Sequence, residues 1–123
     1  MKIRKALEKI KNMKPSQYTD DVMIDWLSAL DGQVWETVLR RYGVPAPVLP
    51  YRQQMLEREL LIPFPHDEVY IAYLGAKIDY HNAEFERYNN GMMLFNAQLQ
   101  EFYDAFTRTH RAAPVSVKGV KML

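Results

Sequence analysis

The fold is decided by residues 67–88, which read DEVYIAYLGAKIDYHNAEFERY. Apolar side chains recur there at helical spacing along two stripes, one through Val69 and Tyr73 and the other through Tyr70 and Leu74. Because two apolar stripes leave only a narrow polar face, the predicted helix must be covered on more than one side. In a chain of 123 residues, part of that cover is expected to come from another subunit.

Helices are also predicted on either side of this central stretch. Residues 2–13 carry apolar side chains on one side and lysines elsewhere, and a second helix is expected from the N-cap Thr19 to about residue 42. A turn at residues 89–91, Asn-Asn-Gly, should lead into a last helix over 92–109 that pairs with the central one as a long antiparallel hairpin. The predicted class is all-α, with about four helices.

A proline-rich connection separates the second helix from the central one. Five prolines within residues 43–65 exclude a continuous helix there, so a long surface-reaching loop is expected. Residues 51–59 can form one or two helical turns, and residues 60–62 a short extended segment that packs on the core. The chain is therefore expected to be a single helical domain over residues 1–110, followed by an extended tail over residues 111–123.

The arrangement of charge is more informative than its total. The formal net charge is +1, but residues 1–14 carry +5, residues 108–123 carry +4 and residues 15–107 carry −8. Such basic ends bind nucleic acid, dock on acidic protein surfaces, or are merely solvated. The residues that form the predicted basic N-terminal patch are Lys2, Arg4, Lys5, Lys9 and Lys11.

The sequence offers little that is typical of catalysis. It has no cysteine, no glycine-rich phosphate loop and no His-Glu-x-x-His pair. The grouping of Asp79, His81 and Glu84 is the only one that resembles a metal site, and residues 66–68, His-Asp-Glu, are better explained as the start of a helix. We expect no enzyme, no metal, no cofactor and no membrane span, but a soluble interaction protein.

The tyrosines on the central helix have two interpretations. They are either core residues with their hydroxyls at the rim, or contact residues at a subunit interface, where tyrosine is enriched. On the second interpretation, the candidate interface residues are Tyr70, Tyr73, Leu74, Tyr80, Tyr51 and Leu56.

Several stretches resemble a family of small proteins from tailed phages and prophages of Gram-positive bacteria, the head–tail connector (adaptor, or head-completion) proteins. The resemblance is carried by ELLIPFPHDEVY (59–70), AKIDY (76–80) and YNNGMMLFN (88–96). The N-terminal stretches IRKALE (3–8), KPSQY (14–18) and WLSALDG (26–32) are similar to the family as well. The loop over 44–58 and the tail match poorly.

The resemblance implies a virion protein of the neck, made in the host cytoplasm. Such a subunit assembles as a ring, dodecameric by analogy with portal symmetry, that links the portal of the DNA-filled head to a stopper or tail component. Double-stranded DNA passes through the channel, and an acidic channel wall would repel phosphates and let DNA slide. Alternatives are a tail-completion protein of the same build, or a small helical DNA-binding or regulatory protein that uses its N-terminal lysines.

By the same analogy, the tail is expected to dock on the portal. It is basic, its valines alternate as in a strand, and no strand is predicted elsewhere to pair with it. The residues expected to dock are Arg111, Pro114, Val115, Val117, Lys118, Val120, Lys121, Met122 and Leu123.

Overall fold

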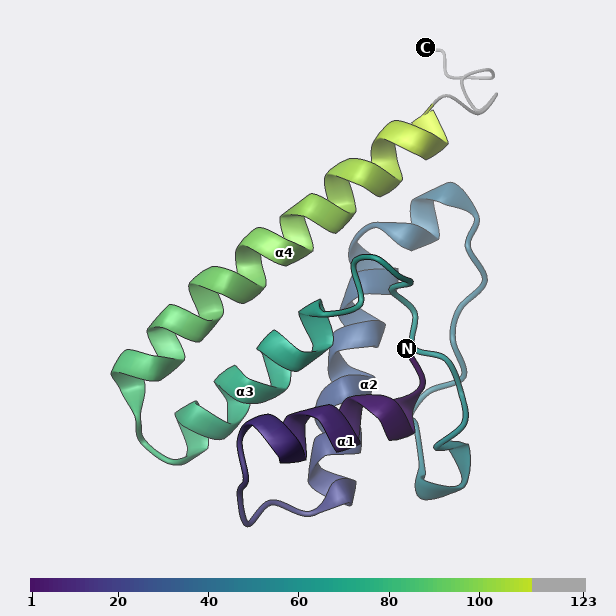
Figure 1. The fold of residues 1–123 in the computed structure, drawn as a ribbon. Coiled ribbons are helices and arrows are strands. Elements are labelled where there is room, and N and C mark those ends of the chain that lie inside the picture. The colour runs from purple at the N-terminus through teal and green to yellow at the C-terminus, as the bar shows by residue number, and fades with distance from the viewer. Residues whose placement is uncertain (112–123) are drawn as a thin grey trace.

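The computed structural model describes residues 1–111, and the predicted docking residues from Pro114 onward lie outside this range. Within it the chain is all-α, without a β-strand, which confirms the predicted fold class (Figure 1). The helices are α1 (Ile3–Met13), α2 (Asp20–Thr37), α3 (Val69–His81) and α4 (Phe85–Arg111), with short 3-10 helices η1 (Leu39–Tyr42) and η2 (Gln53–Met55).

The boundaries of α1 and α2 follow from local sequence. The apolar side of α1 is buried and its lysines lie outside. At the start of α2, the Thr19 hydroxyl accepts a hydrogen bond from the Val22 amide at 3.4 Å, and two aspartates occupy the first turn. The helix continues through Gly32 to Thr37, and η1 then ends at Gly43 with a φ of 79°.

The predicted turn at residues 89–91 is wrong. Instead α3 ends at His81, Ala83 adopts a φ of 60°, and α4 begins at Phe85 and runs straight through the Asn-Asn-Gly stretch. Gly91 faces α3 within this helix, and a Cβ atom at this position would lie 3.4 Å from the Cβ atom of Ala76. This glycine therefore permits a close approach of two helices rather than a turn.

Helix α3 lies at the centre of the fold and contacts each of the other three α-helices. The other three helices cover its two apolar stripes. Helix α4 lies beside α3 and runs in the opposite direction (Figure 1). The longer α4 extends past the start of α3 toward η1, where Tyr42 contacts the rings of Phe106 and His110 at 5.2 and 5.8 Å between centroids. The cover that was expected from another subunit is thus largely provided within the chain.

The long connection between η1 and α3 does more than reach the surface. Tyr51, Leu60 and Ile62 are buried in the core, and the predicted helical turn is present as η2. Lys2 and Glu59 form an isolated antiparallel β-bridge. Residues 58–60 therefore run beside the start of α1. Leu60 and Ile62 pack on the core as expected, but the chain bends at Leu61 and Ile62 rather than being extended over 60–62.

A buried carboxylate, Asp31 on α2, attaches this connection to the helices. One of its oxygens accepts hydrogen bonds from the Tyr51 hydroxyl at 2.6 Å and the Leu61 amide at 2.9 Å, and the other from the Tyr70 hydroxyl at 2.5 Å. Burial raises the pKa of Asp31, while these three hydrogen bonds act in the opposite direction. Burial and the nearby carboxylate also raise the pKa of both tyrosines.

Candidate interaction surfaces

The predicted basic N-terminal patch is largely neutralised within the chain. Both Lys2 and Arg4 contact the Glu57 carboxylate, whose pKa is lowered by the hydrogen bonds from Arg4 and then Lys2. Further ion pairs join Lys9 to Glu68, Lys11 to Asp20 and Lys14 to Asp79. Of the five patch residues, Lys5 alone has no ion pair with the part of the chain that the structure describes. The other four pair with carboxylates of the same chain, although the side chains of Lys2, Arg4 and Lys11 remain about half exposed.

Three of the six candidate interface residues belong to the core. Tyr51, Tyr70 and Leu74 are buried by the chain's own helices, so the prediction that they contact another subunit is wrong. The two tyrosine hydroxyls are satisfied by Asp31, which is why aromatic residues with polar tips are tolerated there.

The other three candidates remain accessible. Tyr73 and Leu56 are half-buried, and Tyr80 at the end of α3 is 48% exposed. Burial, and after it the neighbouring Tyr88, raises the pKa of Tyr73, whose ring lies 5.1 Å from that of Phe95.

The titratable groups around the end of α3 have structural partners. Asp79 is buried and receives two hydrogen bonds from the Lys14 ammonium, at 2.7 and 2.8 Å. The His81 ring stacks on Trp26 at 5.3 Å, nearly parallel to it. Within residues 1–111, no three side chains of the types that bind metals come together in a way that would hold an ion.

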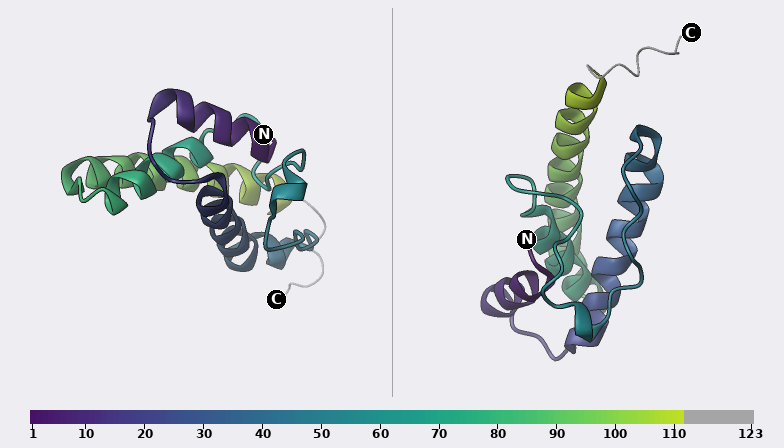
Figure 2. Two further views of the ribbon diagram at one scale, coloured as in Figure 1. Left: turned by 90° about the horizontal axis from the view of Figure 1, so that it is seen from below. Right: turned by 90° about the vertical axis from the view of Figure 1, so that its right-hand side faces the viewer.

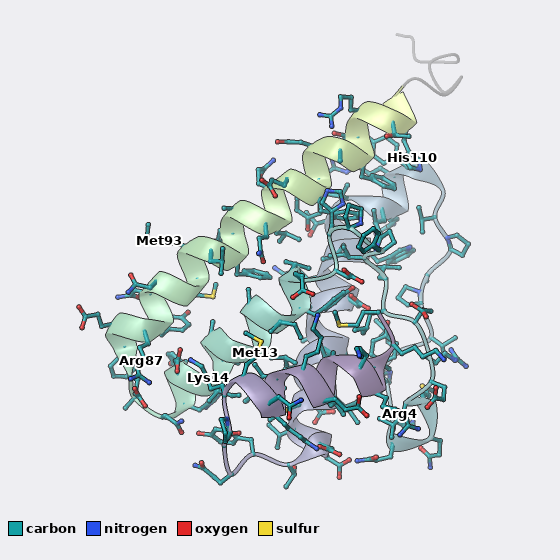
Figure 3. The ribbon with its side chains drawn as sticks, viewed as in Figure 1. Arg4, Met13, Lys14, Arg87, Met93 and His110 are labelled. Atoms are coloured by element: carbon teal, nitrogen blue, oxygen red, sulfur yellow. The ribbon has the colours of Figure 1, made fainter. Side chains whose placement is uncertain are left out.

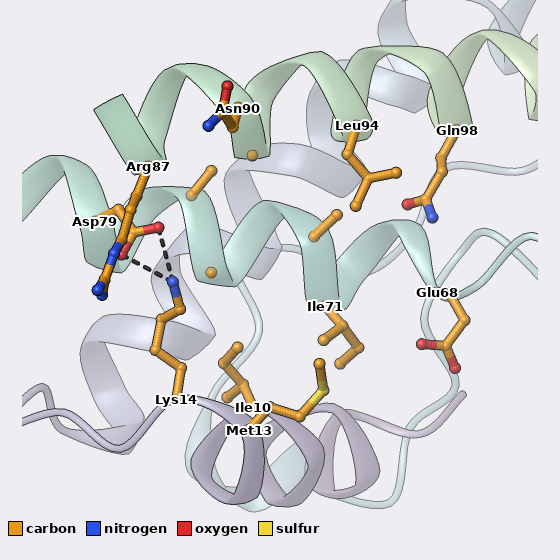
Figure 4. Close-up of a pocket in the computed structure, with 14 residues that line it drawn as sticks. Ile10, Met13, Lys14, Glu68, Ile71, Asp79, Arg87, Asn90, Leu94 and Gln98 are labelled. Atoms are coloured by element: carbon orange, nitrogen blue, oxygen red, sulfur yellow. Dashed lines mark hydrogen bonds and ion pairs between the residues drawn. The ribbon is translucent and has the colours of Figure 1, made fainter. Parts of the chain in front are cut away.

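An open groove of about 420 Å³ lies between α1 and α4, with α3 as its floor (Figure 4). The floor consists of Ala72, Gly75 and Ala76, so it is made of small side chains. Met13 from α1 and Leu94 from α4 form apolar walls and are 67% and 53% exposed. We call this the α1–α4 groove.

The two ends of the α1–α4 groove are polar. The Lys14–Asp79 ion pair and Arg87 lie at one end, and Glu68 and Gln98 at the other (Figure 4). The side-chain oxygen of Gln98 is buried and has no hydrogen-bond partner among the described residues. Further along the surface, Met93 points outward from α4 (Figure 3). Sequence reasoning missed the groove, although Ala72, Gly75 and Ala76 share one side of a helix and indicate a close approach.

We expect the Gly75→Ala substitution to raise the free energy of unfolding by about 1 kcal/mol, because alanine is that much better than glycine inside a helix. A Cβ atom at Gly75 would meet only ordinary contacts, at 3.9 Å to Ile10 and 4.0 Å to Lys14. Urea denaturation followed by circular dichroism measures the change. The matched control is Gly91→Ala, which should gain less because its Cβ atom would lie 3.4 Å from Ala76. If Gly75→Ala lowered the free energy of unfolding, the groove floor at this position would not have room for a methyl group.

Comparison of the chain with protein-family models, with curated proteins and with solved structures finds no match. No helix within residues 1–111 combines the length and the apolar character that crossing a bilayer requires. The described part of the chain is thus characterised by its own geometry: an all-α fold with an open, apolar-walled groove.

Proposed function

We propose that the chain is a head–tail connector subunit of a tailed phage or prophage. In this role it forms a ring beneath the portal, links the DNA-filled head to a stopper or tail component, and surrounds the passing DNA. The observation that carries an assembly role is the α1–α4 groove, with Met13 and Leu94 exposed on a chain whose own core is closed. Exposed apolar surface of this kind is typical of subunits that bind other proteins.

The residues that carry the family resemblance support the proposal because they contact one another. Asp31 belongs to the stretch 26–32, whereas Leu61 and Tyr70 belong to 59–70, and the carboxylate binds both. A resemblance spread over separate stretches of sequence therefore falls on one interlocked unit, the junction between α2, the long connection and α3.

Charge favours a connector over the alternative of a small DNA-binding regulator. A regulator that used the N-terminal lysines would need them free to neutralise phosphates, but four of the five patch residues are paired with carboxylates. The net charge of −8 over residues 15–107 includes Glu57, Glu68 and Asp20, which pair with these cations, and the acids that remain suit a channel wall that DNA slides past without binding.

The portal attachment is tested with the portal protein encoded in the same phage or prophage genome. We expect the full chain to be retained by the immobilised portal, and electron microscopy of the complex to show a ring. A variant lacking residues 114–123 should lose retention while keeping its thermal unfolding transition. Retention by a tail component but not by the portal would favour a tail-completion protein. Shifting of duplex DNA at moderate salt by a monomer or dimer would favour the regulator.

A further inference from the structure

An uncharged, proline-rich segment is displayed along α2. Residues 43–50 read GVPAPVLP, and Pro45 and Pro47 keep the backbone of residues 44–48 extended. The Trp35 indole donates a hydrogen bond to the Val44 carbonyl oxygen at 2.7 Å, and at the other end the Tyr51 amide donates to the Ser28 hydroxyl at 2.7 Å. Between these two attachments Val48 is 56% exposed.

A second cavity, of about 360 Å³, opens between α2 and α4 and is distinct from the α1–α4 groove. None of its lining residues is charged, and Tyr73, Phe95 and Tyr103 supply aromatic surface. Gln33, Thr37 and Asn96 are exposed and lie among the lining residues. We call it the α2–α4 cavity.

The segment and the cavity match in chemistry and in length. Extended proline-rich segments typically dock on aromatic-lined grooves, because proline is preordered and packs flat on rings. From Val44 to Val48 an extended chain spans about 12 Å, and the stretch of α4 from Met92 to Tyr103 that lines the cavity spans about 16 Å, so the cavity is long enough to hold the segment.

The charges beside the two surfaces are complementary. Arg41 and Arg52 flank the segment, are exposed, and have no ion pair within residues 1–111. Asp104 is exposed on α4 beside the cavity-lining Tyr103 and makes no ion pair within that range either; Gln100 donates a hydrogen bond to it. Asp104 beside the uncharged cavity would therefore offer an ion-pair partner to one of the arginines that flank the uncharged segment.

We infer that residues 43–50 of one copy occupy the α2–α4 cavity of a second copy. The segment runs along the side of α2 that faces away from α4 (Figures 1 and 2), and both of its ends are hydrogen-bonded there, so a chain cannot fill its own cavity. Two different surfaces that bind each other between copies form a heterologous interface, which closes into a ring when the rotation allows. This interface rests on the proposed function and specifies how neighbouring ring subunits contact.

Cysteine cross-linking tests the interface directly, because the native chain has no cysteine. Val48→Cys and Asn96→Cys chains are mixed, and a short bismaleimide cross-linker is added to the free protein at high concentration and to the portal-bound assembly. We expect covalent dimers of one chain of each kind, and a ladder of higher species from the double variant. Lys5→Cys on the exposed side of α1 replaces Asn96→Cys in the matched control, which should give at least 10-fold less coupling.

A second variant tests the α2–α4 cavity without a cross-linker, by filling it with a larger side chain. Asn96→Trp should fill the α2–α4 cavity and weaken self-association at least 10-fold in sedimentation, whereas Asn89→Trp, exposed on the same helix, should not.

The outcomes that would overturn the interface are as follows. Equal cross-linking of Val48→Cys to Asn96→Cys and to the control Lys5→Cys overturns it, as does the absence of cross-linking in the portal-bound assembly. A chain that stays monomeric in both conditions overturns it too. Portal retention without cysteine coupling overturns the interface alone, and coupling without portal retention overturns the connector function alone.

Discussion

Replacing Asp31 by alanine is expected to lower the free energy of unfolding by about 3–5 kcal/mol, because two hydroxyls and one amide lose their acceptor inside the core. A buried donor without a partner costs more than the hydrogen bond contributed, and three donors are affected here. The long connection is attached to α2 and α3 through these bonds, so its packing should loosen as well. Urea denaturation measured by circular dichroism and by tyrosine fluorescence gives the change.

The control for this prediction is Asp25→Ala, an exposed aspartate on the same helix, which should change stability by less than about 0.5 kcal/mol. If the two variants lose equal stability, the buried carboxylate does not hold the connection in place.

The pH dependence of the same site has a definite sign. Burial raises the pKa of Asp31 above its ordinary value of 3.8, so the folded chain holds this proton more tightly than the unfolded chain does. Between the ordinary and the raised pKa, this carboxyl therefore makes stability fall as pH rises. The contribution should be visible as the difference between the native chain and Asp31→Asn.

The second large effect is expected from Leu74→Ala, which should lower the free energy of unfolding by about 2–5 kcal/mol. Leu74 is fully buried at the centre of α3, so the truncated side chain leaves a cavity in the hydrophobic core. Leu94→Ala is the matched control, because the same atoms are removed from a half-exposed wall of the α1–α4 groove. It should cost less than about 1 kcal/mol. Similar losses for the two variants would mean that the groove wall is as tightly packed as the core.

The helical class and the first two helices were predictable because their signals are local. Apolar periodicity marks α1, and a threonine cap followed by acids marks the start of α2. The turn before α4 was not predictable in this way. Asn-Asn-Gly is a good turn sequence, but in the structure Gly91 lies inside α4 against Ala76, and the chain reverses at residues 82–84 instead.

The groups that join distant parts of the chain were the hardest to anticipate. The only sequence feature that pointed to a structural role for Asp31 is its place among the apolar residues of α2. Its hydrogen-bond partners lie 20 to 39 residues away, so no local pattern reveals them. The pairing of the N-terminal cations with Glu57 and Glu68 was equally hidden, because a run of lysines reads the same whether or not acids face it. The count of basic residues at the N-terminus therefore did not predict how many of them are left without an acidic partner at the surface.

The contact between the first residues of the chain and residues 58–60 bears on how the protein is made. The amide of Ile3 bonds to the carbonyl of Arg58 at 3.0 Å, and α1 packs on α3, which begins only at Val69. During synthesis, α1 has only its smaller contact with α2 until α3 has left the ribosome, so the core cannot close from the N-terminus onward. Until then the apolar side of α1 stays partly uncovered, and the lysines on its other side favour solubility of the nascent chain.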